Sequence, residues 1–171
     1  MHDFTTNIDI YDESRDLYYK SISNKDKKHE NEKSMFSKIK QPFSKVINLA
    51  IIDTQKDSYK LLFGANENVD IQFVQFEMAY DENQRKIIFQ DEHQNIRNNK
   101  NIVKRGIKNK LLIGLNVEET LELWVANKEG NSLQKLVKVE KDESWHLDVK
   151  NSKIRVISSV NSAFLMQSFE W

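Results

Sequence analysis

The sequence predicts an all-β protein, an antiparallel β-sandwich of jelly-roll type with about nine or ten strands and a polar N-terminal arm. Three observations lead to this fold. From residue 41 onward, apolar residues recur with the period of two that is typical of strands. Turn-forming residues interrupt these stretches about every ten residues. The chain has four glycines and one proline, and asparagine takes many turn positions because it tolerates left-handed conformations.

The change of pattern at residue 41 predicts a partly flexible N-terminal arm over residues 1–40, followed by a single sandwich domain over residues 41–171. The arm is acidic at its start and basic toward its end. Its block from Ser23 to Ser34 contains no apolar residue, so the block cannot contribute to a hydrophobic core.

Two apolar clusters flank this polar block. The first contains Ile8, Ile10, Tyr11, Leu17, Tyr18 and Tyr19. It fits a strand and a segment that docks on a partner protein equally well. The second contains Met35, Phe36, Ile39 and Phe43, of which the first three have helical spacing.

The first strands of the predicted sandwich follow directly. Lys45–Asp53 is apolar on both faces, which predicts a central, buried strand. Strands are also predicted over Ser58–Phe63, Asn68–Tyr80 and Arg85–Gln90. Within the long stretch Asn68–Tyr80 the apolar register slips by one residue at Val74, which predicts a β-bulge.

The second half of the sandwich begins after a long loop, predicted over residues 91–107. The strands predicted there are Lys108–Val117, Thr120–Asn127, Leu133–Glu140, Trp145–Val149, Ile154–Ser158 and Ala163–Trp171. The last of these is apolar enough to predict a core strand, so its removal is expected to unfold the domain.

Composition excludes several classes of protein. The chain has no cysteine, which excludes disulfides, thiolate metal sites and a cysteine nucleophile. Its formal net charge is zero, so general attraction to nucleic acid is not expected. No run approaches the ~20 apolar residues of a membrane span. The N-terminus lacks the features of a secretion leader, which favours a cytoplasmic protein or a subunit of an assembled particle.

A basic segment is the strongest sequence signal for a ligand. Between Gln94 and Val117 there is no acidic residue. Four of its cations, together with one tryptophan, form the candidate site for an anion or a carbohydrate: Arg97, Lys100, Lys104, Arg105 and Trp124. The alternative is a solvated loop whose charge is balanced by Glu118, Glu119 and Glu122. The basic segment from Gln94 to Val117 has no aromatic residue on which a base could stack, so a nucleic-acid partner is not expected.

Catalytic patterns are weak. His146 and Asp148 share one face of a predicted strand, and Asp91-Glu92-His93 brings three donors together, but neither has the spacing of a known metal or acid–base motif. The nucleophile elbow and the P-loop motif are both absent. We therefore predict no catalytic residue, no metal and no cofactor.

The expected function is a non-enzymatic module for protein–protein interaction or assembly into a larger complex, with partner or self contacts made by the first apolar cluster of the arm. A carbohydrate- or anion-binding module is the first alternative. An enzyme with an unrecognised carboxylate or histidine site is the second.

Overall fold

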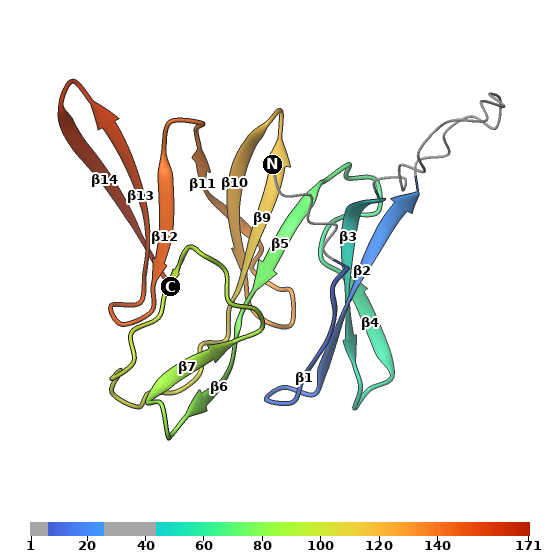
Figure 1. The fold of residues 1–171 in the computed structure, drawn as a ribbon. Helices are drawn as coiled ribbons and strands as arrows, with labels where there is room; N and C mark the ends of the chain where they lie inside the picture. The colour runs from blue at the N-terminus through green and yellow to red at the C-terminus, as the bar shows by residue number, and fades with distance from the viewer. Residues whose placement is uncertain (1–6, 26–43) are drawn as a thin grey trace, which may run out of the picture.

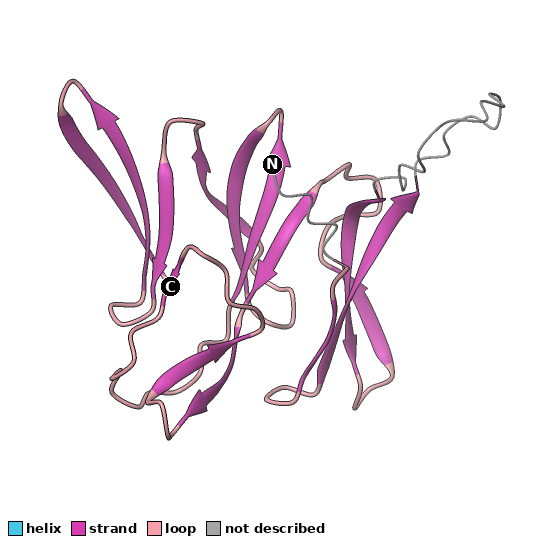
Figure 2. Cartoon of the chain, in the orientation of Figure 1, coloured by secondary structure: helices cyan, strands magenta, loops and turns pink. Residues whose placement is uncertain are grey.

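The computed structural model describes residues 7–25 and 44–171 (Figure 1). These residues form fourteen strands, and no helix occurs among them (Figure 2). The predicted all-β, antiparallel sandwich-like class is confirmed, although the strands outnumber the nine or ten that were expected. The polar block and the second apolar cluster, Met35 to Phe43, lie outside the described residues.

Three four-stranded sheets and one hairpin make up the fold. The first sheet has the order β1-β2-β3-β4, with β1 Asp9–Asp12, β2 Leu17–Lys25, β3 Ser44–Asp53 and β4 Ser58–Leu61. The middle sheet has the order β11-β10-β9-β5, with β5 Ile71–Gln75, β9 Leu111–Val117, β10 Thr120–Ala126 and β11 Gln134–Val139. The third sheet has the order β14-β13-β12-β8, with β8 Ile96–Arg97, β12 Ser144–Asp148, β13 Lys153–Val160 and β14 Ala163–Glu170. The hairpin pairs β6 Glu77–Asp81 with β7 Lys86–Phe89.

The middle sheet lies between the first and the third sheet (Figure 1), and its strand β9 is buried from Leu111 to Leu115 because its side chains enter two hydrophobic cores. In β9, Leu111, Ile113 and Leu115 belong to the core shared with the first sheet. Leu112, between them, belongs to the core shared with the third sheet and the hairpin. A strand whose successive side chains enter opposite cores must be apolar at nearly every position, as β9 is.

Residues 7–25, predicted as part of an arm, form two strands of the first sheet. β2 pairs antiparallel with β3 from Leu17↔Asp53 onward. Ile8, Leu17 and Tyr19 are buried in the first core. Lys20 lies on the opposite, solvated face, because side chains alternate along a strand, whereas Asp12 at the end of β1 is buried.

The stretch predicted as one bulged strand over Asn68–Tyr80 is two strands. β5 ends at Gln75 and β6 begins at Glu77. At Phe76, which is fully buried, the chain leaves the middle sheet for the hairpin. The register slip seen in the sequence therefore marks a change of sheet, with both strands still placing apolar side chains in the cores.

Four hairpin turns share one local design. Asp12, Asp53, Asp81 and Asp148 each end a strand, and the Oδ1 atom of each accepts a hydrogen bond from a backbone N–H two or three residues later. Each turn then ends on a residue with positive φ, namely Asp16, Asp57, Arg85 or Ser152. The aspartate carboxylate satisfies turn N–H groups that would otherwise lack a partner, which explains why so few glycines suffice.

Candidate functional site

Exposed apolar side chains gather at the tip of the β13–β14 hairpin. Phe164 is 79% exposed, Met166 62%, Leu165 58% and Val160 45%. β12 pairs with β13 only as far as Ile157, so the tip extends beyond the neighbouring strand (Figure 1). An apolar group of this size that is left in water is typical of an interaction surface.

The outer part of the hairpin, from Val156 to Phe169, is also free of charge. No charged residue occurs between Arg155 and Glu170, the longest such interval in a chain of which charged residues make up 30%. Elsewhere in the sequence, charges are never this far apart. The tip therefore combines apolar exposure with the absence of the charges that keep other surfaces of this chain solvated.

Both faces of the tip are apolar. Met166 lies opposite Ile157, and Phe164 is opposite Ser159, so one face carries Ile157, Phe164 and Met166. The other face carries Leu165 and Val160. Nearer the base of the same hairpin, Ile154 and Val156 are buried in the second core. On the face of the hairpin that is turned to the second core, the apolar side chains therefore continue from Ile154 and Val156 to Val160 and Leu165, where no other sheet covers them.

The free edge of β14 differs from the other sheet edges among the described strands. β1 carries Asp9 and Asp12, β4 has four residues including Lys60, and β11 carries Lys135 and Lys138. β5, the other edge of the middle sheet, is uncharged but has five residues, four of them buried. β8 has two residues. Charged or short edge strands resist pairing with other chains. The eight-residue β14 has neither protection between Ala163 and Phe169.

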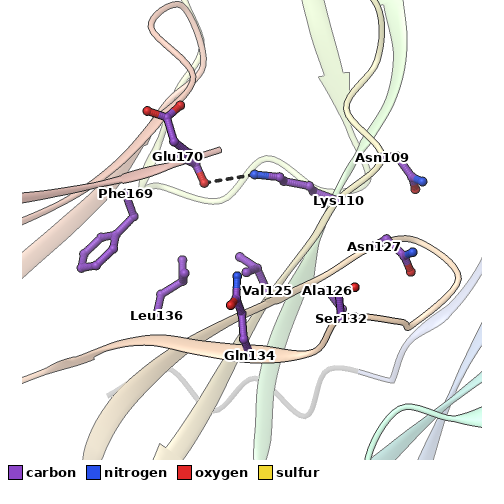
Figure 3. Close-up of a pocket in the computed structure, with 10 residues that line it drawn as sticks. All are labelled: Asn109, Lys110, Val125, Ala126, Asn127, Ser132, Gln134, Leu136, Phe169 and Glu170. Atoms are coloured by element: carbon purple, nitrogen blue, oxygen red, sulfur yellow. Dashed lines mark hydrogen bonds between the residues drawn. The ribbon is translucent and has the colours of Figure 1, made fainter.

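A pocket of about 330 Å³ lies where the end of β14 approaches β10 and β11 (Figure 3). Its walls combine Val125, Leu136 and Phe169 with polar side chains and Lys110, whose Nζ donates to the Glu170 carbonyl oxygen at 3.2 Å. Burial and the neighbouring Lys108 lower the pKa of Lys110 despite Glu170.

The polar groups of this pocket serve the fold. Asn109 Oδ1 accepts from the Lys128 N–H and its Nδ2 donates to Glu129. Asn127 Oδ1 accepts from the Asn131 N–H, which closes a turn. The Glu170 carboxylate pairs with Lys153. The pocket therefore lacks an acid–base pair aimed at its interior.

The basic segment is divided by the fold. Arg105 makes a bidentate ion pair with the buried Glu77, at 2.6 and 2.8 Å, and Lys104 pairs with Glu82. Arg97 and Lys100 remain exposed, with Arg97 donating to the Gln94 carbonyl oxygen. The cations predicted to act together are thus drawn to different partners.

The acidic residues expected to balance this segment bind other lysines. Glu119 pairs with Lys141, and Glu122 pairs with Lys135. Trp124 also does not form an exposed platform, because it is partly buried and donates its Nε1–H to Glu122 at 2.9 Å. Its ring meets that of Phe63 edge-on, at 6.1 Å between centroids.

A second, shallow pocket of about 440 Å³ brings Arg97 to residues that the sequence did not group with it. Arg97, His146 and Lys150 line it, together with Asn98 and Asn99. It forms because β8 runs parallel to β12, with Asp148 opposite Arg97. Burial and the nearby Arg155 and Arg97 lower the pKa of His146, although Asp148 opposes them.

Asp148 is not the partner of His146. It pairs with Arg155 and accepts from Asn151 Nδ2 at 2.7 Å. Partial burial raises the pKa of this carboxyl, but Asn151 and Arg155 outweigh it and lower the pKa to about 2.

The Asp91-Glu92-His93 cluster also does not form a metal site. His93 stacks on Phe73 and Trp145, at 5.0 and 5.9 Å between ring centroids. Glu92 pairs with Lys86. Within residues 7–25 and 44–171, no group of three or more acidic or histidine side chains could hold a metal ion.

The apolar cluster predicted to bind a partner is largely used inside the chain. Ile8, Leu17 and Tyr19 are buried, and the Tyr19 hydroxyl donates to the Lys128 carbonyl oxygen at 2.9 Å. Ile10 and Tyr18 are half-buried. Tyr11 is exposed, with its hydroxyl donating to Asp16. The strand interpretation of this cluster is the one that the structure contains.

A buried charge cluster joins the sheets at the centre of the molecule. Lys128 Nζ lies 2.7 Å from Asp12 Oδ2 and donates to the Glu77 carbonyl oxygen at 2.7 Å. The Glu77 carboxylate accepts from Arg105, from the Lys108 N–H and from Trp171 Nε1. Burial raises the pKa of Glu77, but these donors outweigh it and lower the pKa. All these contacts are internal, so the cluster supports the architecture.

Comparison with known proteins gives no relative: no family model, no curated protein and no solved structure matches the chain. Among the described residues, no helix is long and apolar enough to cross a membrane.

Proposed function

We propose that this chain is a non-enzymatic protein-interaction module whose contact surface is the tip of the β13–β14 hairpin. The observation that carries the proposal is the exposure of Phe164, Leu165 and Met166 on the uncharged outer part of the hairpin. Covering such side chains removes apolar area from water, at roughly 25 cal/mol per Å². The pocket beside β14 supports a non-enzymatic role, since Asn109 and Asn127 in its lining are held by hydrogen bonds within the chain.

Site-specific photo-crosslinking tests this proposal. A photoreactive phenylalanine analogue replaces Phe164 in one variant and Tyr59 in a control. Tyr59 is also highly exposed, but it lies on β4 in the first sheet, whereas the hairpin belongs to the third. We expect protein adducts from position 164, in the cells that make the chain or with the purified chain alone, and none from position 59. Absence of adducts from position 164 in both settings would refute the proposal.

Anion binding at the pocket lined by Arg97, His146, Asp148 and Lys150 is a second candidate. It is favoured by the two cations Arg97 and Lys150 of the lining, while the acid Asp148 is paired with Arg155. An anion in this pocket would stabilise protonated His146 and raise its pKa. We expect the histidine NMR signal of His146 to titrate at higher pH when inorganic phosphate or sulfate is added. The pKa of His93 is lowered by burial against aromatic rings outside this pocket, and His93 serves as the internal control. Equal behaviour of both histidines would remove this candidate.

A further inference from the structure

The open edge of β14 has a defined set of free backbone groups. Asn161 and Ser162 form the two-residue turn of the hairpin with φ values of 49° and 66°, as in a type I′ turn. The residues that flank such a turn, Val160 and Ala163, form a hydrogen-bonded pair, and hydrogen-bonded and non-hydrogen-bonded pairs then alternate. The backbone N–H and C=O groups of Phe164, Met166 and Ser168 therefore point away from β13, toward the open edge.

We infer that this edge pairs with β14 of a second copy of the chain, antiparallel and about a twofold axis at Met166. The inference rests on the interaction surface proposed above and names its occupant. In this register Met166 of one copy lies opposite Met166 of the other, and Phe164 lies opposite Ser168. The pairs formed by these outward-pointing residues can each exchange two backbone hydrogen bonds, so the open edges complete each other.

The charges of the strand fit this register. Glu170 is the charged residue of β14, and it falls opposite Ser162 in the turn of the other copy. Like charges therefore do not meet along the paired strands, and the apolar residues of one copy face uncharged residues of the other. Phe164 and Met166 of both copies come together on one face with Ile157, where they cover one another.

The other described sheet edges make a closed dimer the favoured product. β1, β4 and β11 are charged or short, as is β8, and β5 has five residues, four of them buried. The longer, exposed β14 of one copy therefore finds its best match in β14 of another. Pairing of a surface with itself consumes both edges and stops at two copies. Pairing with a different edge would leave edges open and allow a filament to grow.

Analytical ultracentrifugation of the full chain and of two charge variants tests the pairing. The original chain is expected to sediment as a concentration-dependent dimer. Met166→Lys places two cations opposite each other at the twofold axis, and Met166→Glu places two anions there. Each variant alone is expected to be monomeric, whereas an equimolar mixture should recover a heterodimer, because opposite charges then meet. Met166 is exposed, so both variants are expected to fold, and cooperative thermal melting checks this.

A monomeric original chain, or a Met166→Lys variant that remains dimeric, would overturn the self-pairing. So would a mixture of folded variants that stays monomeric. The proposed interaction surface fails under a different result, the absence of any adduct from position 164. An adduct with another protein, obtained with a monomeric chain, would leave that surface intact and replace its occupant.

Cysteine cross-linking gives an independent check of the register. The chain has no natural cysteine, so each introduced thiol is unique. In the proposed dimer the two residues at position 166 form a hydrogen-bonded pair, whose Cα atoms lie about 5.5 Å apart. A disulfide between two Met166→Cys chains can span this distance. Mild oxidation should link Met166→Cys dimers far faster than Tyr59→Cys chains. Equal rates for the two variants would contradict the twofold register.

Discussion

The centre of the molecule and the tip of the β13–β14 hairpin both depart from the usual placement of charged residues at the surface and apolar residues in the core. At the centre, Glu77, Lys128 and Asp12 are charged and buried. At the tip, Phe164 and Met166 are apolar and exposed. The buried charges find partners within the same chain, at distances of 2.6 to 2.8 Å for the closest contacts. The exposed apolar groups lie where the neighbouring strand has already ended.

The difference shows how two irregular features can have separate meanings. A buried charge whose partners are all internal stabilises the relative placement of the elements that supply them. An exposed apolar group at the uncharged tip of a hairpin contributes little to folding and is available for binding. Substitutions in the two regions should therefore separate stability from association.

The largest effect is expected from Glu77→Gln. The change leaves the guanidinium of Arg105 without a carboxylate in a largely buried site, and loss of one partner of a buried pair lowers the free energy of unfolding by about 3–5 kcal/mol. Urea unfolding measures it. The control is Glu82→Gln at the exposed pair with Lys104, for which a change of about 0–1 kcal/mol is expected. Equal effects of the two substitutions would contradict the stabilising role of the centre.

A smaller loss is expected from Trp171→Phe. The substitution keeps an aromatic ring in the second core but removes the Nε1–H that donates to Glu77 at 2.9 Å. Loss of a donor to a buried charged acceptor lowers the free energy of unfolding by about 1–3 kcal/mol. Because both substitutions act on the same carboxylate, the double variant Glu77→Gln/Trp171→Phe should lose less than the sum of the two. Strict additivity in denaturant unfolding would show that the two groups do not interact.

Acid is expected to destabilise the fold through two carboxyls. The pKa of Glu77 is lowered from 4.5, and that of Asp148 is lowered from 3.8 to about 2. A carboxyl with a lowered pKa in the folded state stabilises the fold at pH values above its unfolded pKa. This contribution is lost as pH falls through the folded pKa. The free energy of unfolding should thus decline from about pH 5 to pH 2. Asp148→Asn should flatten the decline near pH 2 to 4, and an unchanged profile would contradict the lowered pKa of Asp148 that its contacts with Asn151 and Arg155 cause.

The smallest effect on stability is expected at the tip. The combined change Phe164→Ser, Leu165→Thr and Met166→Thr should alter the free energy of unfolding by no more than about 0.5 kcal/mol, because these side chains are exposed. The same variant should lose association in sedimentation experiments. A loss of several kcal/mol would instead indicate that the tip is packed, as the sequence alone predicted for the whole segment 163–171.

The sequence predicted the fold class because strand periodicity and turn residues are local properties. It underestimated the strands where burial is one-sided, as at Leu17 and Tyr19 among polar neighbours. The turn aspartates were a usable signal: a strand that ends in Asp, followed four residues later by a residue able to adopt positive φ, occurs at Asp12, Asp53, Asp81 and Asp148.

The candidate surface could not be located in this way. The apolar pattern of β14 is the same whether a sheet covers it or water does, and coverage depends on where β12 ends. The fate of the basic segment was equally hidden, because Arg105 pairs with Glu77, which is 28 positions away in the sequence. What the sequence did contain was the absence of charge from Val156 to Phe169. That stretch is the longest interval without charge in the sequence.

The connectivity of the sheets has a consequence for how the chain folds. Strands that follow one another along the chain make most ladders, in the runs β1 to β4, β9 to β11 and β12 to β14. Two ladders join distant segments: β5 with β9, and β8 with β12. Two distant segments must come together, at a cost in chain entropy, before the contacts between them can stabilise the fold. Non-local pairings are therefore slow steps. The three runs are therefore expected to form early, and the β5–β9 ladder, which closes the middle sheet, is expected to set the folding rate.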